Sequence, residues 1–425
     1  MTPVADHHAH IWSAKAAALS VPPILPAVDL PKDLADLFQQ REDRVRAGAY
    51  EAAAELFTED AQVLIMLAPA WVRGPTAVRF ATRSTAAVHL VPNHYVLDDT
   101  IGYVTGTGVF PQRPDHHVTN FFIVVLRDTA GRWRIAAETI TPNAPPVARA
   151  ISAQHFVAEL DAANVRRGVL LSVAYMFASP HHGGPEERSL VRMENEWLSR
   201  QVARHPERLV GFGSVNPLKE HAVEEIAAIA ASPNLSGLKL HLGNSEVDLR
   251  REDHSDALRR TFAAANEHRL PVLAHMMVLG MQYGRDHAEA FIEHVLPAAP
   301  DVPVQIAHLA GSGPGHDGDD ALVAYIDAIA TNRPQMRRVS FDVASTVVAG
   351  ASAESLTLIA ERLRQIGLER VLFGSDRAGD SNDSPQDAWR AFRRLPLRED
   401  EFRIVATNLA PYMRPSGRSR RPSNA

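Results

Sequence analysis

Three short apolar runs in this chain end in a histidine or an aspartate. They cover residues 270–275, 302–308 and 370–376, and they end in His275, His308 and Asp376. The parallel strands of a (β/α)8 barrel carry their active-site groups at their carboxyl ends, so this shared position constrains the fold as well as the chemistry. A chain with this pattern is expected to form a parallel barrel that gathers these side chains at one end.

Eight apolar runs of strand length occur outside the region from about residue 30 to residue 145. Helical patterns, such as those over residues 156–164 and 222–230, separate them, and this alternation is typical of a parallel sheet. The predicted fold class is therefore α/β, a (β/α)8 TIM barrel. The eight predicted strands are residues 3–8, 167–173, 209–215, 237–241, 271–275, 302–308, 338–343 and 370–375.

The first of these runs lies in the motif Asp6-His7-His8-Ala9-His10. Residues two apart in a strand point to the same side, so His8 and His10 are expected to direct both imidazoles to one point. Such a pair is suited to binding a metal ion.

The strand–helix rhythm breaks between residues 32 and 142. Two helical patterns come first and alternating runs follow, which predicts an α+β domain with an antiparallel sheet. Proline-rich flanks indicate an insert in the loop after the first barrel strand. We assign residues 1–30 and 146–412 to the barrel, 32–142 to the insert and 413–425 to a disordered basic tail.

Five motifs in this order resemble the amidohydrolase superfamily, and within it the amidohydrolase-related branch of small-acid decarboxylases and lactonases. They are DHHAHIW (6–12), GLKLHLG (237–243), VLAHMM (272–277), IAHLAG (306–311) and FGSDRAG (373–379). The resemblance covers residues 1 to about 20 and about 150 to 412. It implies the barrel fold, a divalent metal and a small-molecule substrate.

The insert resembles a SnoaL-like, or NTF2-like, cone domain. The resemblance rests on the passage AGAYEAAAELFTEDAQV (47–63), on Gly74 with a following helix, and on the terminal hairpin DTAGRWRI (128–135). Stabilisation or dimerisation of the protein is the preferred role for this domain, and a lid or a second ligand site is the alternative.

The resemblance to the superfamily places His8, His10, His275 and Asp376 on its metal positions. Three neutral nitrogens and one carboxylate favour zinc, with one coordination position open for a water molecule whose pKa falls to about 7. The chain has no cysteine, so the ligands are limited to histidine, carboxylate or modified lysine. We expect one ion, with two ions as the alternative.

Asp376 and His308 are the candidate catalytic residues. Asp376 would accept a proton with the oxygen that does not bind metal, and His308 would act as an acid or base, or as a ligand of a second ion. Lys239 leaves two interpretations open. In binuclear members of the superfamily a carboxylated lysine on this strand bridges two metals, whereas the single-metal branch keeps a plain lysine, and the plain lysine is preferred here.

Four further residues are candidates for contact with the substrate. His241 lies on the same face of its strand as Lys239, and Tyr175 and Asn216 follow the second and third strands. Arg377 stands where the family often has proline or a small residue, and it offers a positive charge for a substrate carboxylate.

Composition excludes several other classes of protein. The formal net charge is −6 and the basic residues are scattered apart from the short tail, so no nucleic-acid partner is expected. The chain contains no apolar run of 18 residues, and its first ligand motif begins within eight residues of the start. We therefore expect a cytoplasmic protein without a membrane partner, which forms either a monomer or a homodimer.

These features together predict a metal-dependent hydrolase that cleaves a C–O or C–N bond of a small, carboxylated or lactone-like substrate through metal-activated water. The first alternative is a metal-dependent, non-oxidative decarboxylase of a small aromatic or unsaturated acid. The second is a non-catalytic protein that binds its ligand through the NTF2-like insert.

Overall fold

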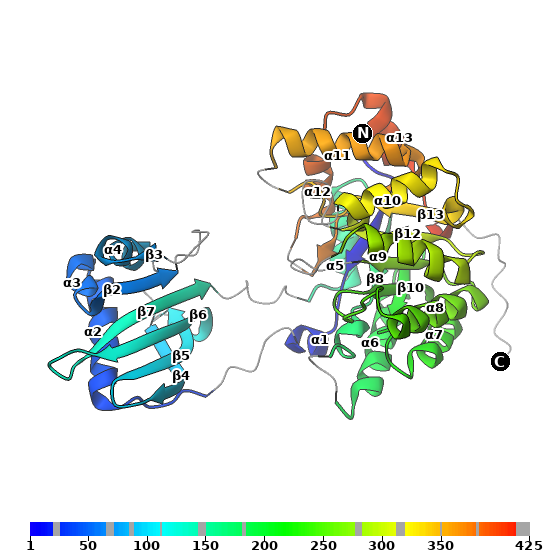
Figure 1. Ribbon diagram of the computed structural model, residues 1–425. Helices are drawn as coiled ribbons and strands as arrows, with labels where there is room; N and C mark the ends of the chain where they lie inside the picture. Colours follow the sequence, from blue (N-terminus) through cyan, green and yellow to red (C-terminus); the bar gives the residue numbers. More distant parts are fainter. Residues whose placement is uncertain are drawn as a thin grey trace. The chain divides into compact units, whose positions relative to one another are not determined.

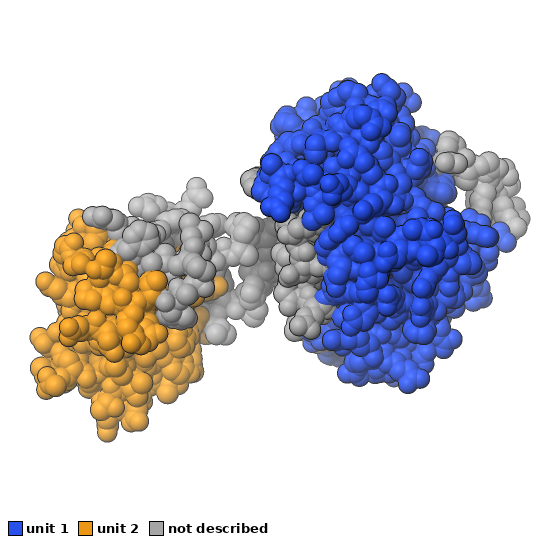
Figure 2. Space-filling view, turned by 45° about the horizontal axis from the view of Figure 1, so that its top comes forward, with its two compact units in different colours: residues 1–20, 148–425 blue, residues 21–147 orange. Residues whose placement is uncertain are grey.

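The chain folds into two compact units (Figures 1 and 2). Unit 1 comprises residues 1–20 and 148–425, and unit 2 comprises residues 21–147. The structure is a computed structural model that describes residues 1–19, 26–64, 72–84, 89–110, 113–142, 150–180, 184–276, 283–311, 319–348, 351–379 and 382–413.

Unit 1 is built on one sheet in which every paired strand is parallel to its neighbour. The strand order is β14-β13-β12-β11-β10-β9-β8-β1-β15, so neighbours in the sheet follow the chain order, as expected for repeated βα units. The strands are β1 (Ala5–His10), β8 (Arg167–Leu171), β9 (Leu209–Ser214), β10 (Leu235–His241), β11 (Val272–His275), β12 (Val304–Ile306), β13 (Val339–Asp342), β14 (Val371–Leu372) and β15 (Arg377–Ala378).

The two ends of this sheet meet through the last strand of the sequence. Strand β14 pairs with β13, and β15, only four residues further on, pairs with β1. Between them the carbonyl of Phe373 accepts a hydrogen bond from His7 N at 2.9 Å, and Asp376 N donates to the carbonyl of His8 at 2.8 Å. β14 and β15 are thus two parts of one eighth strand, and the parallel α/β barrel predicted from the strand rhythm is present.

Helices lie between successive strands along the chain and cover the outside of the sheet (Figure 1). Helix α5, for example, begins after Ser152, whose hydroxyl accepts a hydrogen bond from His155 N and caps the helix. The helices of unit 1 are α1 (Ala14–Leu19), α5 (Ala153–Ala162), α6 (Glu187–Val202), α7 (Ala222–Ala231), α8 (Glu252–Glu267), α9 (Arg285–Ala290), α10 (Asp319–Ala330), α11 (Ala353–Ile366), α12 (Pro385–Phe392) and α13 (Glu399–Thr407).

Alternate residues of the strands belong to two separate apolar clusters. On β10, Leu238 and Leu240 pack in the large cluster shared with the helices, which leaves Lys239 on the opposite, inner face. The inner face has its own smaller cluster, which includes Phe212 of β9 and Leu273 of β11. The barrel interior is therefore apolar in part and polar toward the carboxyl ends of the strands.

A register shift in β1 decides which of its histidines face inward. Ala5 belongs to the inner cluster and Ala9 to the outer one, although residues four apart in a regular strand share a face. The pairing of β1 with β8 shifts between Asp6 and Ala9, as at a β-bulge, and this shift reverses the alternation. His8 and His10 consequently point inward. The strand also runs to His10, two residues beyond the predicted 3–8, because Ala9 and His10 pair with both β8 and β15.

Residues after α13 complete the inner cluster. Ala410 and Met413 are buried in it, and Met413 ends a short 3-10 turn, η7 (Pro411–Met413). The prediction that the tail begins at residue 413 is therefore wrong for that residue, since its apolar side chain packs into the barrel. The rest of the predicted tail, residues 414–425, lies outside the described residues.

The described part of unit 2 combines three helices with a six-stranded sheet of order β3-β2-β7-β6-β5-β4. All its strand pairs are antiparallel except β2 with β7. A separate apolar core joins the sheet to α2, and a buried ion pair between Arg41 and Glu138 links α2 to β7. The elements are α2 (Lys32–Arg46), α3 (Tyr50–Ala54), β2 (Phe57–Leu64), β3 (Val72–Arg73), α4 (Pro75–Ser84), β4 (His89–Leu97), β5 (Ile101–Phe110), β6 (Arg113–Arg127) and β7 (Trp133–Pro142).

None of the helices within the described ranges has the length and the apolar character needed to cross a membrane.

Replacing residues 32–142 by a short Gly/Ser linker should leave a soluble barrel that still binds metal, because unit 2 has a hydrophobic core of its own. Circular dichroism and elemental analysis of the shortened chain would measure this. A shortened chain that fails to fold would show that the barrel depends on the insert.

Candidate metal centre

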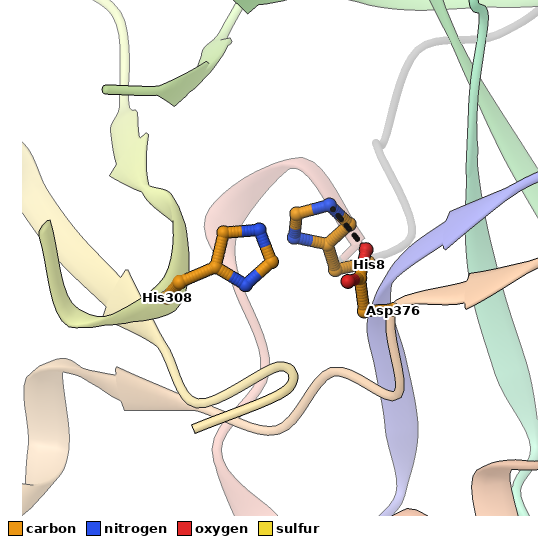
Figure 3. Close-up of side chains that lie close together, drawn as sticks. All are labelled: His8, His308 and Asp376. Atoms are coloured by element: carbon orange, nitrogen blue, oxygen red, sulfur yellow. Dashed lines mark ion pairs between the residues drawn. The ribbon is translucent and has the colours of Figure 1, made fainter. Parts of the chain in front are cut away.

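Side chains from both ends of the chain converge at the carboxyl ends of the barrel strands (Figure 3). His8 Nε2 lies 3.1 Å from His10 Nε2 and 3.4 Å from Asp376 Oδ1, and His10 Nε2 lies 3.8 Å from the same oxygen. Ligands held about 2.0–2.2 Å from a tetrahedral ion lie roughly 3.3–3.6 Å from one another. The three atoms are therefore spaced as ligands of one ion would be.

Two more histidines adjoin this group. His308 follows β12, and its ligand atom lies within 4.8 Å of those of His8 and Asp376. His308 Nε2 is 3.0 Å from Nδ1 of His275, the last residue of β11. The structure thus brings His8, His10 and Asp376 of the predicted ligand set together and places His308 beside them, while His275, the fourth predicted ligand, lies against His308.

Hydrogen bonds fix which nitrogen of two histidines carries the proton. His8 Nδ1 lies 3.0 Å from Asp342 Oδ2, and His308 Nδ1 lies 2.7 Å from the carbonyl of Ala344. Carboxylate and carbonyl oxygens only accept, so each Nδ1 donates and each neutral ring keeps its lone pair on Nε2.

The lone pair of His8 therefore faces the carboxylate of Asp376 across 3.4 Å. Two acceptors directed at each other repel unless a proton or a cation lies between them. His10 Nδ1, which is buried, has no hydrogen-bond partner within the described part of the chain. This donor set fits a divalent cation.

Asp342 at the end of β13 supports the cluster and was not among the predicted site residues. It is fully buried, and four donors surround its carboxylate. Oδ2 accepts from His8 Nδ1 and from Gln305 Nε2, while Oδ1 accepts from the backbone amides of His308 and Ala344. Burial alone would raise the pKa of Asp342, but the facing His8 and His308 outweigh it and hold this pKa well below its usual value.

The backbone at two of the cluster residues is in the left-handed region. Asp376 has φ of 56°, and His308, Leu309 and Ala310 have φ of 54°, 52° and 69°. Such conformations cost free energy for residues other than glycine and persist where surrounding contacts hold them. At His308 the holding contact is the hydrogen bond from its amide to Asp342.

The cluster is dry on one side and open on the other. His8, His10 and His308 are buried, whereas His275 and Asp376 are half-buried and Ser345, which donates to Asp376 Oδ2 at 2.8 Å, is exposed. Burial lowers the pKa of His8 and, more strongly, those of His10 and His275. In the metal-free protein these rings are neutral at pH 7, which is the form that binds metal.

Lys239 lies on the inner face of β10, fully buried, and its amine has no hydrogen-bond partner among the described residues. Burial lowers its pKa to about 8, although Asp376 and Asp342 act in the opposite direction. The pKa values of His10 and His241 are lowered by burial and, after that, by the positive charge of Lys239. With this pKa the amine is still mostly charged at pH 7, and it becomes neutral at a lower pH than an exposed lysine does.

Two of the predicted substrate contacts lie beside the cluster. The ring of His241 stacks on that of His275, with centroids 4.0 Å apart, and Tyr175 packs against His241 at 4.9 Å. Asn244 N donates to His241 Nδ1, so the neutral ring carries its proton on Nε2. His241 can therefore donate a hydrogen bond with that nitrogen.

The other two predicted contacts are engaged elsewhere. Arg377 forms a two-point ion pair with Glu159 of α5, at 2.7 and 3.1 Å, so its charge is neutralised there. Asn216 is buried and holds its own loop, donating to the carbonyl of Ala178 and accepting from Leu218 N. Neither arrangement supports the expectation that these side chains bind substrate.

The fold and the site together define the class of this protein: it is an α/β barrel with a His/Asp centre at the carboxyl ends of its strands. A family model described as Amidohydrolase matches residues 5–407, and the chain therefore belongs to the Amidohydrolase family. Comparison with curated proteins gave no match.

Solved structures similar to this chain include decarboxylases of low sequence identity. 5-Carboxyvanillate decarboxylase from Sphingomonas paucimobilis is 18% identical, with 59% of this chain and 79% of that chain covered and a TM-score of 0.41. The enzyme of that name from Novosphingobium aromaticivorans, complexed with manganese and 4-hydroxy-3-methoxy-5-nitrobenzoic acid, is 16% identical, covering 61% and 79%, with a TM-score of 0.41. 2,6-Dihydroxybenzoate decarboxylase from Rhizobium is 13% identical, covering 59% and 84%, with a TM-score of 0.39.

Replacing His8 or Asp376 by alanine should abolish stoichiometric metal binding while the barrel still folds, because these residues lie at the strand ends and not in the apolar core. Elemental analysis of protein purified without a tag or chelator would measure the metal content. His294→Ala, which removes an exposed histidine, is the matched control. Full metal content in both site variants would disprove the assignment.

Replacing Lys239 by methionine should stabilise the metal-free protein, because the buried ammonium is destabilising. A pKa lowered from 10.5 to about 8 corresponds to roughly 3 kcal/mol against folding. This penalty is fully present below pH 8 and disappears as the pH rises toward 10.5, so the gain of the variant should shrink over that range. Urea unfolding at pH 7 and at pH 10 would measure it. An equal gain at both values would contradict the argument.

Proposed function

We propose that this protein is a metal-dependent hydrolase that cleaves a C–O or C–N bond of a small, lactone-like or carboxylated substrate. The observation that carries the proposal is the convergence of His8 Nε2, His10 Nε2 and Asp376 Oδ1 within 3.1–3.8 Å of one another in a buried position. Membership of the Amidohydrolase family is consistent with it.

A divalent ion at such a centre polarises a bound carbonyl and lowers the pKa of coordinated water. His8, His10 and Asp376 would hold the ion, with His275 as the fourth ligand. The predominance of nitrogen donors favours zinc. We favour one ion, because the ligand atoms of His8, His308 and Asp376 form one compact group, within 4.8 Å of one another.

Proton transfer in this proposal is assigned to His308. Its Nδ1 donates to Ala344 O, so Nε2, which lies 3.0 Å from His275 Nδ1, is the ring nitrogen that would accept a proton and return it to the leaving group. His241 would orient the substrate by donating from Nε2. A substrate carboxylate would find its positive partner in Lys239, since Arg377 is already paired with Glu159.

A specific feature of Asp376 favours decarboxylation as a second candidate. Its Oδ2 already accepts hydrogen bonds from Ser345 at 2.8 Å and from Asn382 at 3.2 Å. These two donors occupy the oxygen that does not face His8, so less of it is available to take a proton from water. A decarboxylase needs no such base. It needs a proton donor to carbon, and His308 would be that donor.

The role of unit 2 is a separate part of the proposal. We propose that it stabilises or dimerises the protein, and a lid over the barrel is the alternative. A purely ligand-binding function of the whole protein is disfavoured, because a mere scaffold has no need of several buried histidines with lone pairs directed at one point.

Isotope labelling would separate the two reactions. The zinc-loaded protein would be incubated in ¹⁸O-water with small lactones, amides, and aromatic or unsaturated acids, and both labelled product and carbon dioxide would be followed. For hydrolysis we expect ¹⁸O in the product, a rate that rises between about pH 6 and 8, and a nearly inactive Asp376→Asn variant. The decarboxylase would be established instead by release of carbon dioxide with no ¹⁸O in the organic product. In that case His308→Gln should lose the most activity.

A further inference from the structure

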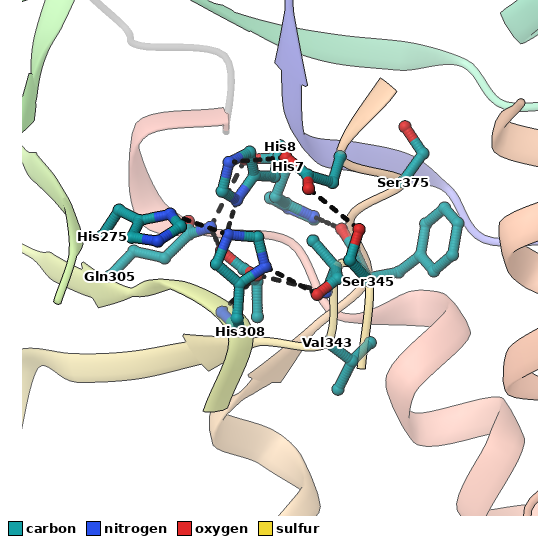
Figure 4. A network of polar contacts seen from close by, with 12 residues as sticks. His7, His8, His275, Gln305, His308, Val343, Ser345 and Ser375 are labelled. Atoms are coloured by element: carbon teal, nitrogen blue, oxygen red, sulfur yellow. Dashed lines mark hydrogen bonds and ion pairs between the residues drawn. The ribbon is translucent and has the colours of Figure 1, made fainter. Parts of the chain in front are cut away.

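A chain of hydrogen bonds, partly buried at Tyr412 and fully buried beyond it, connects the C-terminal segment to the metal centre through the barrel interior. The hydroxyl of Tyr412 in η7 donates to Gln305 Oε1 of β12. Gln305 Nε2 donates to Asp342 Oδ2 at 2.7 Å, and the same oxygen accepts from His8 Nδ1 at 3.0 Å. Figure 4 shows Gln305 beside His8 and His308. Three side chains thus lead from the segment after α13 to His8.

The chemistry of its ends fixes the direction of this chain. A carboxylate only accepts hydrogen bonds, so Gln305 must present its NH₂ group to Asp342 and its carbonyl oxygen to Tyr412. Tyr412 stabilises this orientation of the amide as a donor. Without that hydroxyl, a flip of the amide would place an oxygen against the carboxylate of Asp342 and remove a donor from the oxygen that orients His8.

The segment that carries Tyr412 is anchored on several strands. Asn408 Nδ2 donates to the carbonyl of Val371 in β14 at 2.6 Å, and Ala410 N donates to Nε2 of His7 at 3.3 Å. The Tyr412 ring meets Phe212 of β9 edge to face, with centroids 5.0 Å apart. These contacts hold the Tyr412 hydroxyl beside Gln305. The position of the segment can therefore affect how Gln305 and Asp342 are oriented.

We propose that Tyr412 and Gln305 are positioning residues of the metal centre: docking of residues 408–413 into the barrel orients Asp342 and thereby holds the His8 imidazole with Nε2 available to metal. The inference rests on the metal centre of the proposed function and is independent of the choice between hydrolysis and decarboxylation. The competing interpretation is that the Tyr412 hydroxyl contributes only to stability, like any buried hydrogen bond.

Tyr412→Phe tests the proposal, because it removes the hydroxyl and keeps the ring. Tyr325→Phe is the matched control, since the buried Tyr325 hydroxyl has that of Tyr283, 3.0 Å away, as its one partner among the described residues. Zn²⁺ affinity would be measured by competition with a chromophoric chelator, and the His8 tautomer in the metal-free protein by ¹⁵N NMR of the imidazoles. Thermal unfolding would be recorded for every variant.

We expect Tyr412→Phe to weaken Zn²⁺ binding about tenfold, within the range of about 10–100-fold found when groups behind the ligands are removed. The His8 resonances should show loss of the pure Nδ1–H tautomer. Tyr325→Phe should lower thermal stability to a similar extent and leave Zn²⁺ affinity and tautomer unchanged. Equal Zn²⁺ affinity in Tyr412→Phe and the wild type would overturn the proposal, and absence of Zn²⁺ binding by the wild type would instead refute the metal centre.

Gln305→Met provides a second route if Tyr412→Phe does not fold. It removes the amide and nearly conserves volume, and it should weaken Zn²⁺ binding at least as much as Tyr412→Phe. Because both residues act through one chain, the double variant should bind Zn²⁺ no more weakly than Gln305→Met alone. Additive losses in the double variant would show that the two residues act separately and would contradict the proposal.

Discussion

The rest of the centre depends on the hydrogen bonds that the carboxylate of Asp342 accepts. It is buried, and its four hydrogen bonds come from the His8 ring, the Gln305 amide, and the backbone amides of His308 and Ala344. An unpaired charge in such a position would be strongly destabilising, and the four donors together offset that cost. The same bonds orient a ligand ring, hold a strained backbone turn and join three strands. Site geometry and barrel stability are therefore two results of one buried group.

The arrangement of the barrel gives this carboxylate its reach. Asp342 and His8 are 334 residues apart in the sequence and meet only because the eighth strand pairs with β1 on one side and with β13 on the other. The register shift in β1 then turns His8 and His10 inward. Closure of the sheet and the β-bulge together place Nδ1 of His8, near the start of the chain, against Oδ2 of Asp342, which lies 334 residues later.

Much of this could be predicted from the residues alone, and the omissions have physical causes. Strand rhythm and ligands at strand ends are local patterns, so the barrel and the cluster of His8, His10, His275 and Asp376 follow from them. Asp342 is the last but one residue of the predicted strand 338–343, so a search for acidic residues near the strand ends would have found it. The ion pair of Arg377 with Glu159 depends on where α5 packs. The burial of Met413 depends on the apolar cluster inside the barrel, which the chain reaches only after α13. Those are tertiary facts that no local pattern contains.

The pairing of the first strand with the last has a consequence for biosynthesis. A ribosome releases β1 first, yet its partner in the eighth strand emerges more than 350 residues later. At a synthesis rate of about 5–20 residues per second, many seconds pass between the synthesis of His8 and His10 and that of Asp376. Unit 2, with its local hairpins and its own core, can fold during that interval. The metal centre can therefore be completed only after the eighth strand has been synthesised, and metal ions can meet their full ligand set only from that point on.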